Sequence, residues 1–199
     1  QKAFDFIRGD AVPICEPSMI YHGSLGLRCS ESAKALAGIL NSNPDAPVFM
    51  DVNLRPPWWQ ARQISQLLDA ATWLKLSGDE LETLVDTAGD HQKKAAVLLQ
   101  RHDLALVMVT QGEQGAFAMD EAGSIFSVQP EKVSRVVDTV GAGDAFASVC
   151  ILGLLKKWDM ETILSRAQSF ASALVEQQGA TVHERSFYQL FKTQWQLPN

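Results

Sequence analysis

Apolar residues follow two different spacings along this chain, and each spacing predicts one kind of element. Short runs of apolar and β-branched residues predict strands, and the clearest is Leu104–Thr110, a run typical of a parallel sheet covered on both faces. Longer segments repeat apolar residues at helical spacing, as in Ser30–Leu40, where Ser30 is the expected N-cap. The prolines Pro56-Pro57 are expected to open a helix that runs to about Ala70, because proline is tolerated in a first turn.

The remaining expected strands are Ala3–Ile7, Met19–His22, Val48–Asp51, Thr72–Leu76, Gly115–Met119 and Ser124–Val128. The remaining expected helices are Asp79–Asp86, His91–Arg101, Ala145–Leu155, Glu161–Gln178 and Glu184–Trp195.

Strands that alternate with helices predict βαβ units and a three-layer α/β fold. The segment Asp120-Glu121-Ala122-Gly123 between the last two strands is a hairpin signal. In open sheets of this kind, ligands bind beyond the carboxyl ends of the strands. We therefore expect the motifs at Asp51, Leu76, Thr110 and residues 141–144 to lie on one rim.

Composition and charge narrow the class of protein. The chain has 199 residues, 46% of them hydrophobic and 20% charged, which is typical of one globular domain. The net charge is −6 and no Lys/Arg run is present, so neither nucleic acid nor a membrane is an expected partner. No apolar run reaches the ~18 residues of a membrane span. Three cysteines without metal-ligand spacing predict free thiols and a cytoplasmic protein.

The stretch Val137–Phe146 holds the strongest candidate chemistry. Its glycine-rich turn feeds a long apolar helix, so free backbone N–H groups and the helix dipole are directed at one point, where an anion such as a phosphate can bind. Asp144 follows the turn and can accept a proton. Together these features predict phosphoryl transfer to a hydroxyl. The alternative is a tight strand-to-helix connection in which Asp144 only complements the dipole.

Three further segments on the expected rim have both a structural and a functional interpretation. Thr110–Gly115 is either a phosphate-binding loop or a turn into the next strand. Ser77–Glu80 has the Ser-x-x-Glu spacing of a capping box, which is the favoured interpretation from the residues alone. In Asp51–Arg55, the arginine can bind a phosphate in a bidentate manner or form a loop salt bridge.

These segments together resemble one family. Asp138–Phe146 resembles the signature D-T-x-G-A-G-D-x-F of the ribokinase-like (PfkB) carbohydrate kinases. The motifs D-x-N-x-R at Asp51–Arg55, S-x-x-E at Ser77–Glu80 and V-T-x-G-x-x-G at Val109–Gly115 precede it in the family's order, and the likeness is greatest to fructokinases. The resemblance implies a three-layer α/β/α sandwich with a mostly parallel sheet and an ATP-dependent sugar kinase.

The resemblance implies a role for each matching residue. Asp144 is the general base on the sugar hydroxyl, and the backbone of the Gly141 turn stabilises the transferring phosphoryl group. Arg55 contacts that phosphate or the sugar, and Asn53 supports the site. The corresponding turn residues are Gly141, Ala142 and Gly143, and the residues expected to line the ATP phosphates and ribose are Thr110, Gly112 and Gly115.

The metal sites are implied by resemblance as well. Glu80 is expected to hold a water of hydrated Mg²⁺. Ser77 stands where the family has an asparagine, and this departure leaves its role as a cofactor contact open. Asp138 is the side-chain candidate for a monovalent cation such as K⁺.

Two thinner matches lie near the ends of the chain. Phe6-Ile7-Arg8 resembles an aromatic-x-Arg segment that touches substrate, although an ordinary edge-strand charge explains Arg8 equally well. The helix around Ser172 and the loop around Gly179 resemble the segment that flanks adenine, and small residues on a packed helix explain that stretch as well.

The chain departs from the family pattern in length. Residues 1–199 match the carboxyl-terminal two-thirds of a family member, mainly the nucleotide-binding portion, and the first residue is Gln1. The family's N-terminal third, with a Gly-Gly motif that grips the sugar and a β lid that often forms a homodimer, is not expected in this chain. Three functions stay open: a fructokinase-like kinase, a silent ATP-binding module, and a kinase for ribose, a nucleoside, ketodeoxygluconate or a sugar phosphate.

Overall fold

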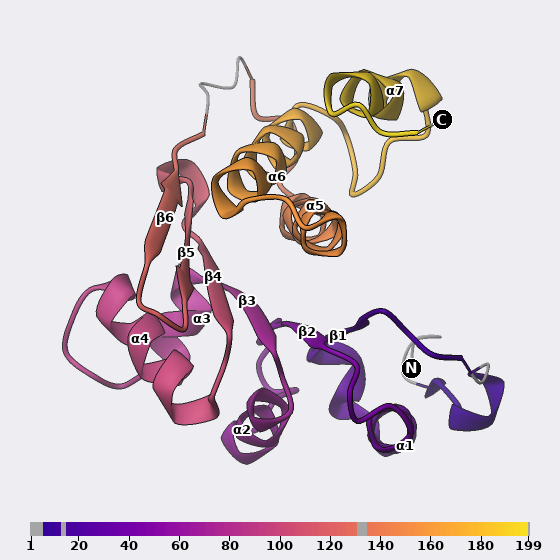
Figure 1. The fold of residues 1–199 in the computed structure, drawn as a ribbon, viewed down its shortest axis with the longest axis vertical. Coiled ribbons are helices and arrows are strands. Elements are labelled where there is room, and N and C mark those ends of the chain that lie inside the picture. The colour runs from indigo at the N-terminus through magenta and orange to yellow at the C-terminus, as the bar shows by residue number, and fades with distance from the viewer. Residues whose placement is uncertain (1–5, 13–14, 131–134, 199) are drawn as a thin grey trace. The chain divides into compact units, whose positions relative to one another are not determined.

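The computed structural model describes residues 6–12, 15–130 and 135–198. The chain divides into two compact units (Figure 1). The first unit comprises the residues up to Gln111 together with Phe117–Ile125. The second unit comprises Gly112–Ala116 and the residues from Phe126 onward.

A six-stranded sheet with the order β1-β2-β3-β4-β5-β6 is the centre of the α/β fold. Its first four strands pair in parallel, and a helical segment connects each to the next, as the sequence predicts. The strands are β1 (Ile20–Gly23), β2 (Val48–Asp51), β3 (Trp73–Ser77), β4 (Leu106–Thr110), β5 (Ala116–Asp120) and β6 (Ile125–Val128). The helices between β1 and β4 are α1 (Ser30–Ser42), α2 (Ala61–Asp69), α3 (Gly78–Leu84) and α4 (His91–His102).

The core of the first unit forms between one face of the sheet and the helices α2, α3 and α4. Ile64, Leu81 and Leu98 from these helices pack in one cluster with Leu74 and Val107 from the strands. Each such fully buried side chain contributes about 1.5–3 kcal/mol to folding. All four residues of β2 and the first four residues of β4 are buried. Because alternate residues of a strand point to opposite faces, both faces of the sheet are covered there. This is the environment expected for the central layer of a three-layer fold.

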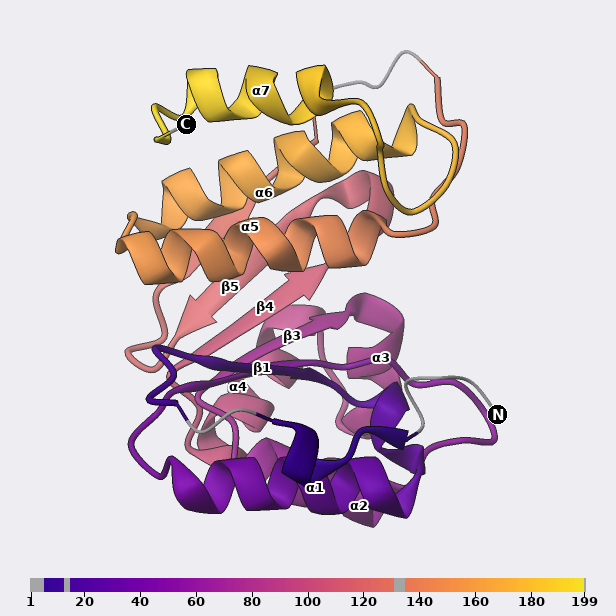
Figure 2. The same cartoon turned by 90° about the vertical axis from the view of Figure 1, so that its right-hand side faces the viewer.

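The second unit is built from the helices α5 (Ala142–Lys156), α6 (Met160–Val175) and α7 (Arg185–Gln194) (Figure 2). Asp159 caps α6, because its Oδ1 accepts a hydrogen bond of 2.8 Å from the Thr162 amide. The ring of Phe170 on α6 lies 4.9 Å from that of Phe191 on α7, centroid to centroid. Among the described residues, no helix has both the length and the apolar character needed to cross a membrane.

Three local predictions were wrong or fall partly outside the described residues. Helix α2 begins at Ala61, whereas a start at Pro56 was predicted; a residue that precedes a proline is disfavoured in the α region, so Pro56 cannot serve as a first turn before Pro57. Ser30 is the first residue of α1, and Cys29 occupies the N-cap position without a side-chain hydrogen bond. Of the expected strand Ala3–Ile7, residues 3–5 lie outside the described residues, and residues 6 and 7 are not in a strand.

Candidate active site

The glycine turn before α5 has the geometry of an anion site. Gly141 has a φ of 86°, and a Cβ at this position would lie 2.7 Å from the Ala180 carbonyl oxygen, so glycine is required. The Ala142 amide donates to the Thr139 oxygen at 3.3 Å. The amides of Gly143 and Asp144 have no hydrogen-bond partner among the described residues. Two N–H groups at the positive end of the α5 dipole are thus available to an anion.

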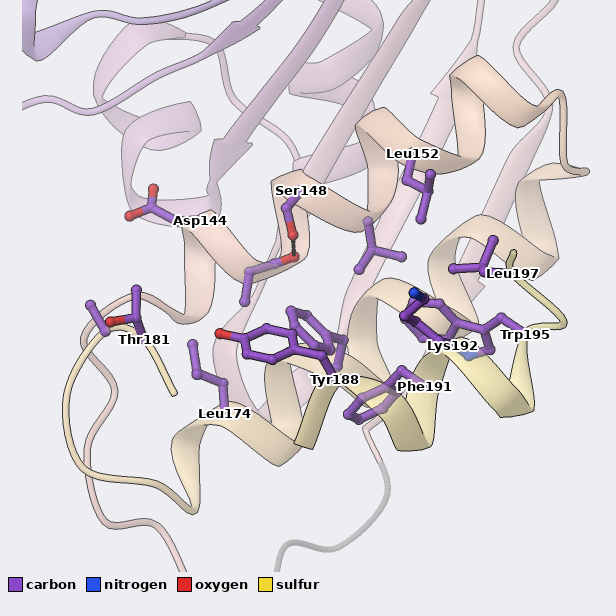
Figure 3. Close-up of a pocket in the computed structure, with 14 residues that line it drawn as sticks. Asp144, Ser148, Leu152, Leu174, Thr181, Tyr188, Phe191, Lys192, Trp195 and Leu197 are labelled. Atoms are coloured by element: carbon purple, nitrogen blue, oxygen red, sulfur yellow. Dashed lines mark hydrogen bonds between the residues drawn. The ribbon is translucent and has the colours of Figure 1, made fainter. Parts of the chain in front are cut away.

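The carboxylate of Asp144 faces open space. Asp144 is exposed and lines a cavity of about 430 Å³ between α5 and α7, whose other walls include Ser148, Tyr188 and Phe191 (Figure 3). The Ser148 hydroxyl donates to the Ala145 carbonyl oxygen at 2.7 Å. Within the described part of the chain, the Asp144 carboxylate has neither a hydrogen-bond nor an ion-pair partner. The carboxylate is therefore free to accept a proton, and Figure 3 shows it directed away from the other labelled residues of the cavity.

The carboxylate of Asp138 joins the turn before α5 to the loop after α6 through two hydrogen bonds. Its Oδ1 accepts from the Val140 amide at 2.9 Å and its Oδ2 accepts from the Gly179 amide at 3.1 Å. Its own amide donates to the Val175 oxygen at 3.1 Å. Each carboxylate oxygen keeps a lone pair, so the structure leaves room for the monovalent cation that the family resemblance implies.

The residues predicted near adenine are only partly at the cavity. Ala180 and Thr181 line it, whereas Ser172 and Gly179 do not. The Ser172 hydroxyl accepts from the Gln168 amide at 3.2 Å along α6. The cofactor roles of Ser172 and Gly179 stay predictions.

In the first unit, the strand register brings the other motifs to one edge of the sheet, as predicted. Asp51 pairs with Lys75, and Ser77 pairs with Thr110, at the carboxyl ends of β2, β3 and β4. The Thr110 hydroxyl donates to the Leu76 carbonyl oxygen at 3.5 Å. This contact leaves the oxygen lone pairs of Thr110 available.

Ser77 and Glu80 form the predicted capping box of α3. The Ser77 hydroxyl accepts from the Glu80 amide at 3.3 Å, and Glu80 Oε2 accepts from the Ser77 amide at 2.8 Å and from the Ser77 hydroxyl at 2.9 Å. Glu80 Oε1 accepts from the Leu54 amide at 2.9 Å. A carboxylate has about four lone-pair positions, so Glu80 keeps one for a donor such as a metal-bound water.

Asn53 is held by its backbone and leaves its side-chain oxygen unpaired. The Ser24 hydroxyl donates to the Asn53 carbonyl at 3.0 Å and accepts from the Asn53 amide at 2.8 Å. Asn53 Oδ1 is buried and has no partner among the described residues. A buried acceptor of this kind is suited to a donor from a ligand, either a hydroxyl or a metal-bound water.

The arginines differ in their environment. Arg55 is exposed and forms no ion pair within the described residues, so the loop salt bridge considered for it is not present. Arg8 donates from Nε to Asp10 Oδ1 at 3.0 Å and pairs through Nη2 with Oδ2 of the same residue, which raises the pKa of the guanidinium. Because no strand includes Arg8, it is not an edge-strand charge. Its contact with substrate stays a prediction.

The two glycines after β4 have different functions in the structure. A Cβ at Gly115 would lie 2.0 Å from the Val128 carbonyl oxygen, so close packing requires this glycine. Gly112 has a φ of 58° and open space around the position of a Cβ. Gly112 is therefore the one of the pair whose backbone a ligand can approach.

Sequence reasoning missed a buried ion pair on the neighbouring strands. Lys75 Nζ lies 2.9 Å from Asp51 Oδ1, and each side chain is only 7% exposed. A lysine in the middle of the apolar strand Trp73–Ser77 was the available signal, because a lysine is almost never fully buried without a partner.

The structure thus combines an α/β fold whose first four strands are parallel with two unpaired amides at a helix N-terminus and an unpaired carboxylate beside them, an arrangement suited to binding an anion. The family model described as "pfkB family carbohydrate kinase" matches residues 14–185. The chain belongs to the pfkB family of carbohydrate kinases.

Curated relatives are similar over about half of their own length. Probable fructokinase-5 of Arabidopsis thaliana is 31% identical over 173 residues, which cover 80% of this chain and 52% of the relative. 5-Dehydro-2-deoxygluconokinase of Bacillus subtilis is 27% identical over 139 residues, 67% of this chain and 42% of that protein. The chain therefore spans about half the length of the curated relatives it matches.

Solved structures show the same fold. Adenosine kinase from Sinorhizobium meliloti has a TM-score of 0.81 at 16% identity and covers 95% of this chain and 59% of its own. Aminoimidazole riboside kinase from Salmonella enterica, solved with aminoimidazole riboside and an ATP analog, has a TM-score of 0.73 at 24% identity, over 95% of this chain and 66% of its own. The predicted ribokinase-like fold is confirmed.

Proposed function

We propose that the protein carrying this chain is an ATP-dependent sugar kinase, and that residues 1–199 form its nucleotide-binding portion. One observation carries the proposal: the exposed, unpaired Asp144 carboxylate lies directly beside the unpaired amides of Gly143 and Asp144. A base and an anion site on one turn are what phosphoryl transfer to a hydroxyl requires.

In the proposed reaction, Asp144 accepts the proton of the acceptor hydroxyl as its oxygen attacks the γ-phosphorus of ATP. The bond to the β,γ-bridging oxygen breaks, and ADP leaves. The N–H groups of Gly143 and Asp144 stabilise the charge on the transferring phosphoryl group, and the Ala142 amide is already bonded to Thr139. General-base catalysis of this kind contributes about 10²–10⁴-fold to the rate.

The first unit is proposed to contribute to phosphate and metal binding. Arg55 has a free guanidinium for phosphate, and Thr110 offers a hydroxyl. Gly112, the next glycine along the chain, belongs to the second unit and offers accessible backbone. Asn53 Oδ1 and the remaining lone pair of Glu80 suit the water shell of Mg²⁺. When bound, Mg²⁺ neutralises charge on the ATP phosphates.

Proteins that are similar to this chain support the ligands in this proposal. A fructokinase from Vibrio cholerae, with a TM-score of 0.74 and 23% identity, was solved with fructose, ADP and potassium ion. The Asp138 corner is our candidate for the corresponding potassium site. The similarity to fructokinase-5 favours a fructose-like acceptor, and the similarity to 5-dehydro-2-deoxygluconokinases supports a keto acid sugar as the second candidate.

The experiment that tests the proposal has two arms. Calorimetric titration with Mg·ATP measures nucleotide binding, and a coupled ADP assay over a panel of sugars measures transfer. Binding together with sugar-dependent ADP release supports the kinase. Binding without ADP release for any sugar indicates the alternative, a silent ATP-binding module, and the absence of binding rejects both.

A further inference from the structure

His91, the first residue of α4, contacts two other segments of the first unit, the residue after β4 and the helix α3. Its Nδ1 lies 2.8 Å from Nε2 of Gln111, the residue after β4. Its Nε2 lies 3.3 Å from Oε1 of Glu82 on α3. Its ring also covers Gly78, where an added Cβ would lie 2.7 Å from the His91 Cε1 atom.

The hydrogen-bond partners define the tautomer of His91. The Gln111 amide nitrogen can only donate, so Nδ1 of His91 is the acceptor. Nε2 then carries the proton and donates to the Glu82 carboxylate. Lys94 pairs with the other oxygen of Glu82. A continuous series of side-chain contacts therefore runs from Lys94 through Glu82 and His91 to Gln111.

This series of contacts connects Gln111, at the end of β4, with the start of α3, and the proposed function assigns both places to nucleotide binding. Gln111 lies directly between Thr110 and Gly112, and Gly78 directly follows Ser77. The imidazole of His91 therefore packs against Gly78 at the start of α3, and it also binds the side chain of Gln111 after β4. The D-x-N-x-R, S-x-x-E and T-x-G motifs do not include His91 or assign a role to it.

We propose that His91 is a positioning residue for nucleotide binding, which holds the turn at Thr110–Gly112 against the turn at Ser77–Glu80. It does not touch ATP itself and acts through Gln111. The inference rests on the proposed function, because it assigns those two turns to the nucleotide. A purely structural role, in which His91 only packs α4 against α3, predicts a loss of stability without a specific loss of ATP affinity.

The binding experiment compares His91→Ala and Gln111→Leu with the double variant. Each single change removes the same hydrogen bond and should raise the Kd for Mg·ATP about 5- to 10-fold, the effect of a net hydrogen-bond contribution. The double variant should bind Mg·ATP no more weakly than the single variant with the higher Kd, because both single changes already remove the same hydrogen bond. In steady state the KM for ATP should rise, while kcat should change less than about 2-fold.

Two further variants separate positioning from packing. In His91→Asn, Oδ1 takes the place of Nδ1 and can accept from Gln111, so this variant should recover most of the affinity. Gln92→Ala changes the exposed neighbour on the same helix and should match the wild type in both Kd and melting temperature. If His91→Ala lowers the melting temperature but leaves the Kd unchanged, or if the effects of His91→Ala and Gln111→Leu simply add, the positioning role is rejected.

A ligand-free measurement keeps this inference distinct from the proposed function. Nitrogen NMR of the imidazole should show an unprotonated Nδ1 and a protonated Nε2 in the apo protein, and Gln111→Leu should shift the Nδ1 signal. A protonated Nδ1 at neutral pH overturns the inference whatever the protein binds. A wild-type protein that shows the expected tautomer but does not bind Mg·ATP overturns the proposed function and, with it, the nucleotide role of His91.

Discussion

Gly141 is the residue whose backbone sets the direction of the free amides at the start of α5. Its φ of 86° disfavours any side chain, and a Cβ would collide with Ala180. We predict that Gly141→Ala lowers the free energy of unfolding by more than the ~1 kcal/mol of a left-handed conformation alone and weakens Mg·ATP binding. Urea unfolding and calorimetry measure the two effects.

Gly179→Ala is the matched control for that variant. Gly179 also has a positive φ, of 87°, but no atom lies within 4 Å of the position of its Cβ. The Gly179→Ala variant should therefore lose only the free energy that a left-handed backbone costs alanine, without a steric clash like that at residue 141. Equal destabilisation by the two variants would contradict the close approach of residue 141 to Ala180.

His22 on β1 makes the stability of the first unit depend on pH. Burial lowers the pKa of His22 from its ordinary value of 6.5, and its Nε2 is a buried atom without a partner among the described residues. The unfolded chain binds the proton more readily than the folded one, so the free energy of unfolding should fall as the pH drops below 6.5. The slope from this one proton has an upper limit of about 1.4 kcal/mol per pH unit.

Urea unfolding between pH 7.5 and about 5.5 checks this slope. His22→Gln stays neutral and should flatten the dependence in that window, whatever its effect at high pH. His183 is exposed, so His183→Gln should keep the wild-type slope. A slope that persists in His22→Gln would show that another group is responsible.

At the residue scale, the sequence predicted the roles of those residues that interact with close neighbours in the chain. The capping box of Ser77 and Glu80 spans one helical turn and was therefore visible. The hydrogen bond between Asp138 and Gly179 joins residues that are 41 positions apart in the sequence. The hydrogen bonds between Ser24 and Asn53 join residues that are 29 positions apart. Such contacts arise from tertiary packing, and no short pattern encodes them.

At the scale of elements, the pair Lys75–Asp51 joins the side chains of β3 and β2. Lys75→Met would leave the Asp51 carboxylate buried without this cation, and we predict a loss of about 3–5 kcal/mol in the free energy of unfolding. The double variant with Asp51→Asn should lose less than the sum of the single losses, since the buried carboxylate charge is removed together with the lysine.

Chemical unfolding of the two single variants and the double variant measures this coupling. Lys34→Met on α1, an exposed position, is the control and should stay within about 0.5 kcal/mol of the wild type. Strictly additive losses in the double variant would show that the two side chains do not interact energetically.

Element types were predicted well, because apolar periodicity reports burial directly. The strand Val48–Asp51 was predicted with the bounds that the structure has, and the start of α4 at His91 was predicted as well. The start of α2 was not, because two consecutive prolines favour a turn, closed here by a 2.7 Å bond from the Trp58 amide to the Arg55 oxygen.

At the scale of the whole molecule, the net charge of −6 opposes the binding of a polyphosphate, so affinity must come from local donors. The structure supplies such donors in each unit: the amides of Gly143 and Asp144 in the second, and Arg55 in the first. The motif order predicted the family and the fold. The cavity beside Asp144 was not predictable, because its walls come from α5 and α7, which are far apart in sequence.

The most direct test of the account is sugar-dependent ADP release by Asp144→Asn, measured on the protein that carries this chain with the sugar that the wild type phosphorylates. Asparagine keeps the size of the side chain but cannot accept the hydroxyl proton, so the rate should fall by about 10²–10⁴-fold while Mg·ATP still binds. Turnover within a few-fold of the wild type would contradict the central claim that Asp144 is the catalytic base.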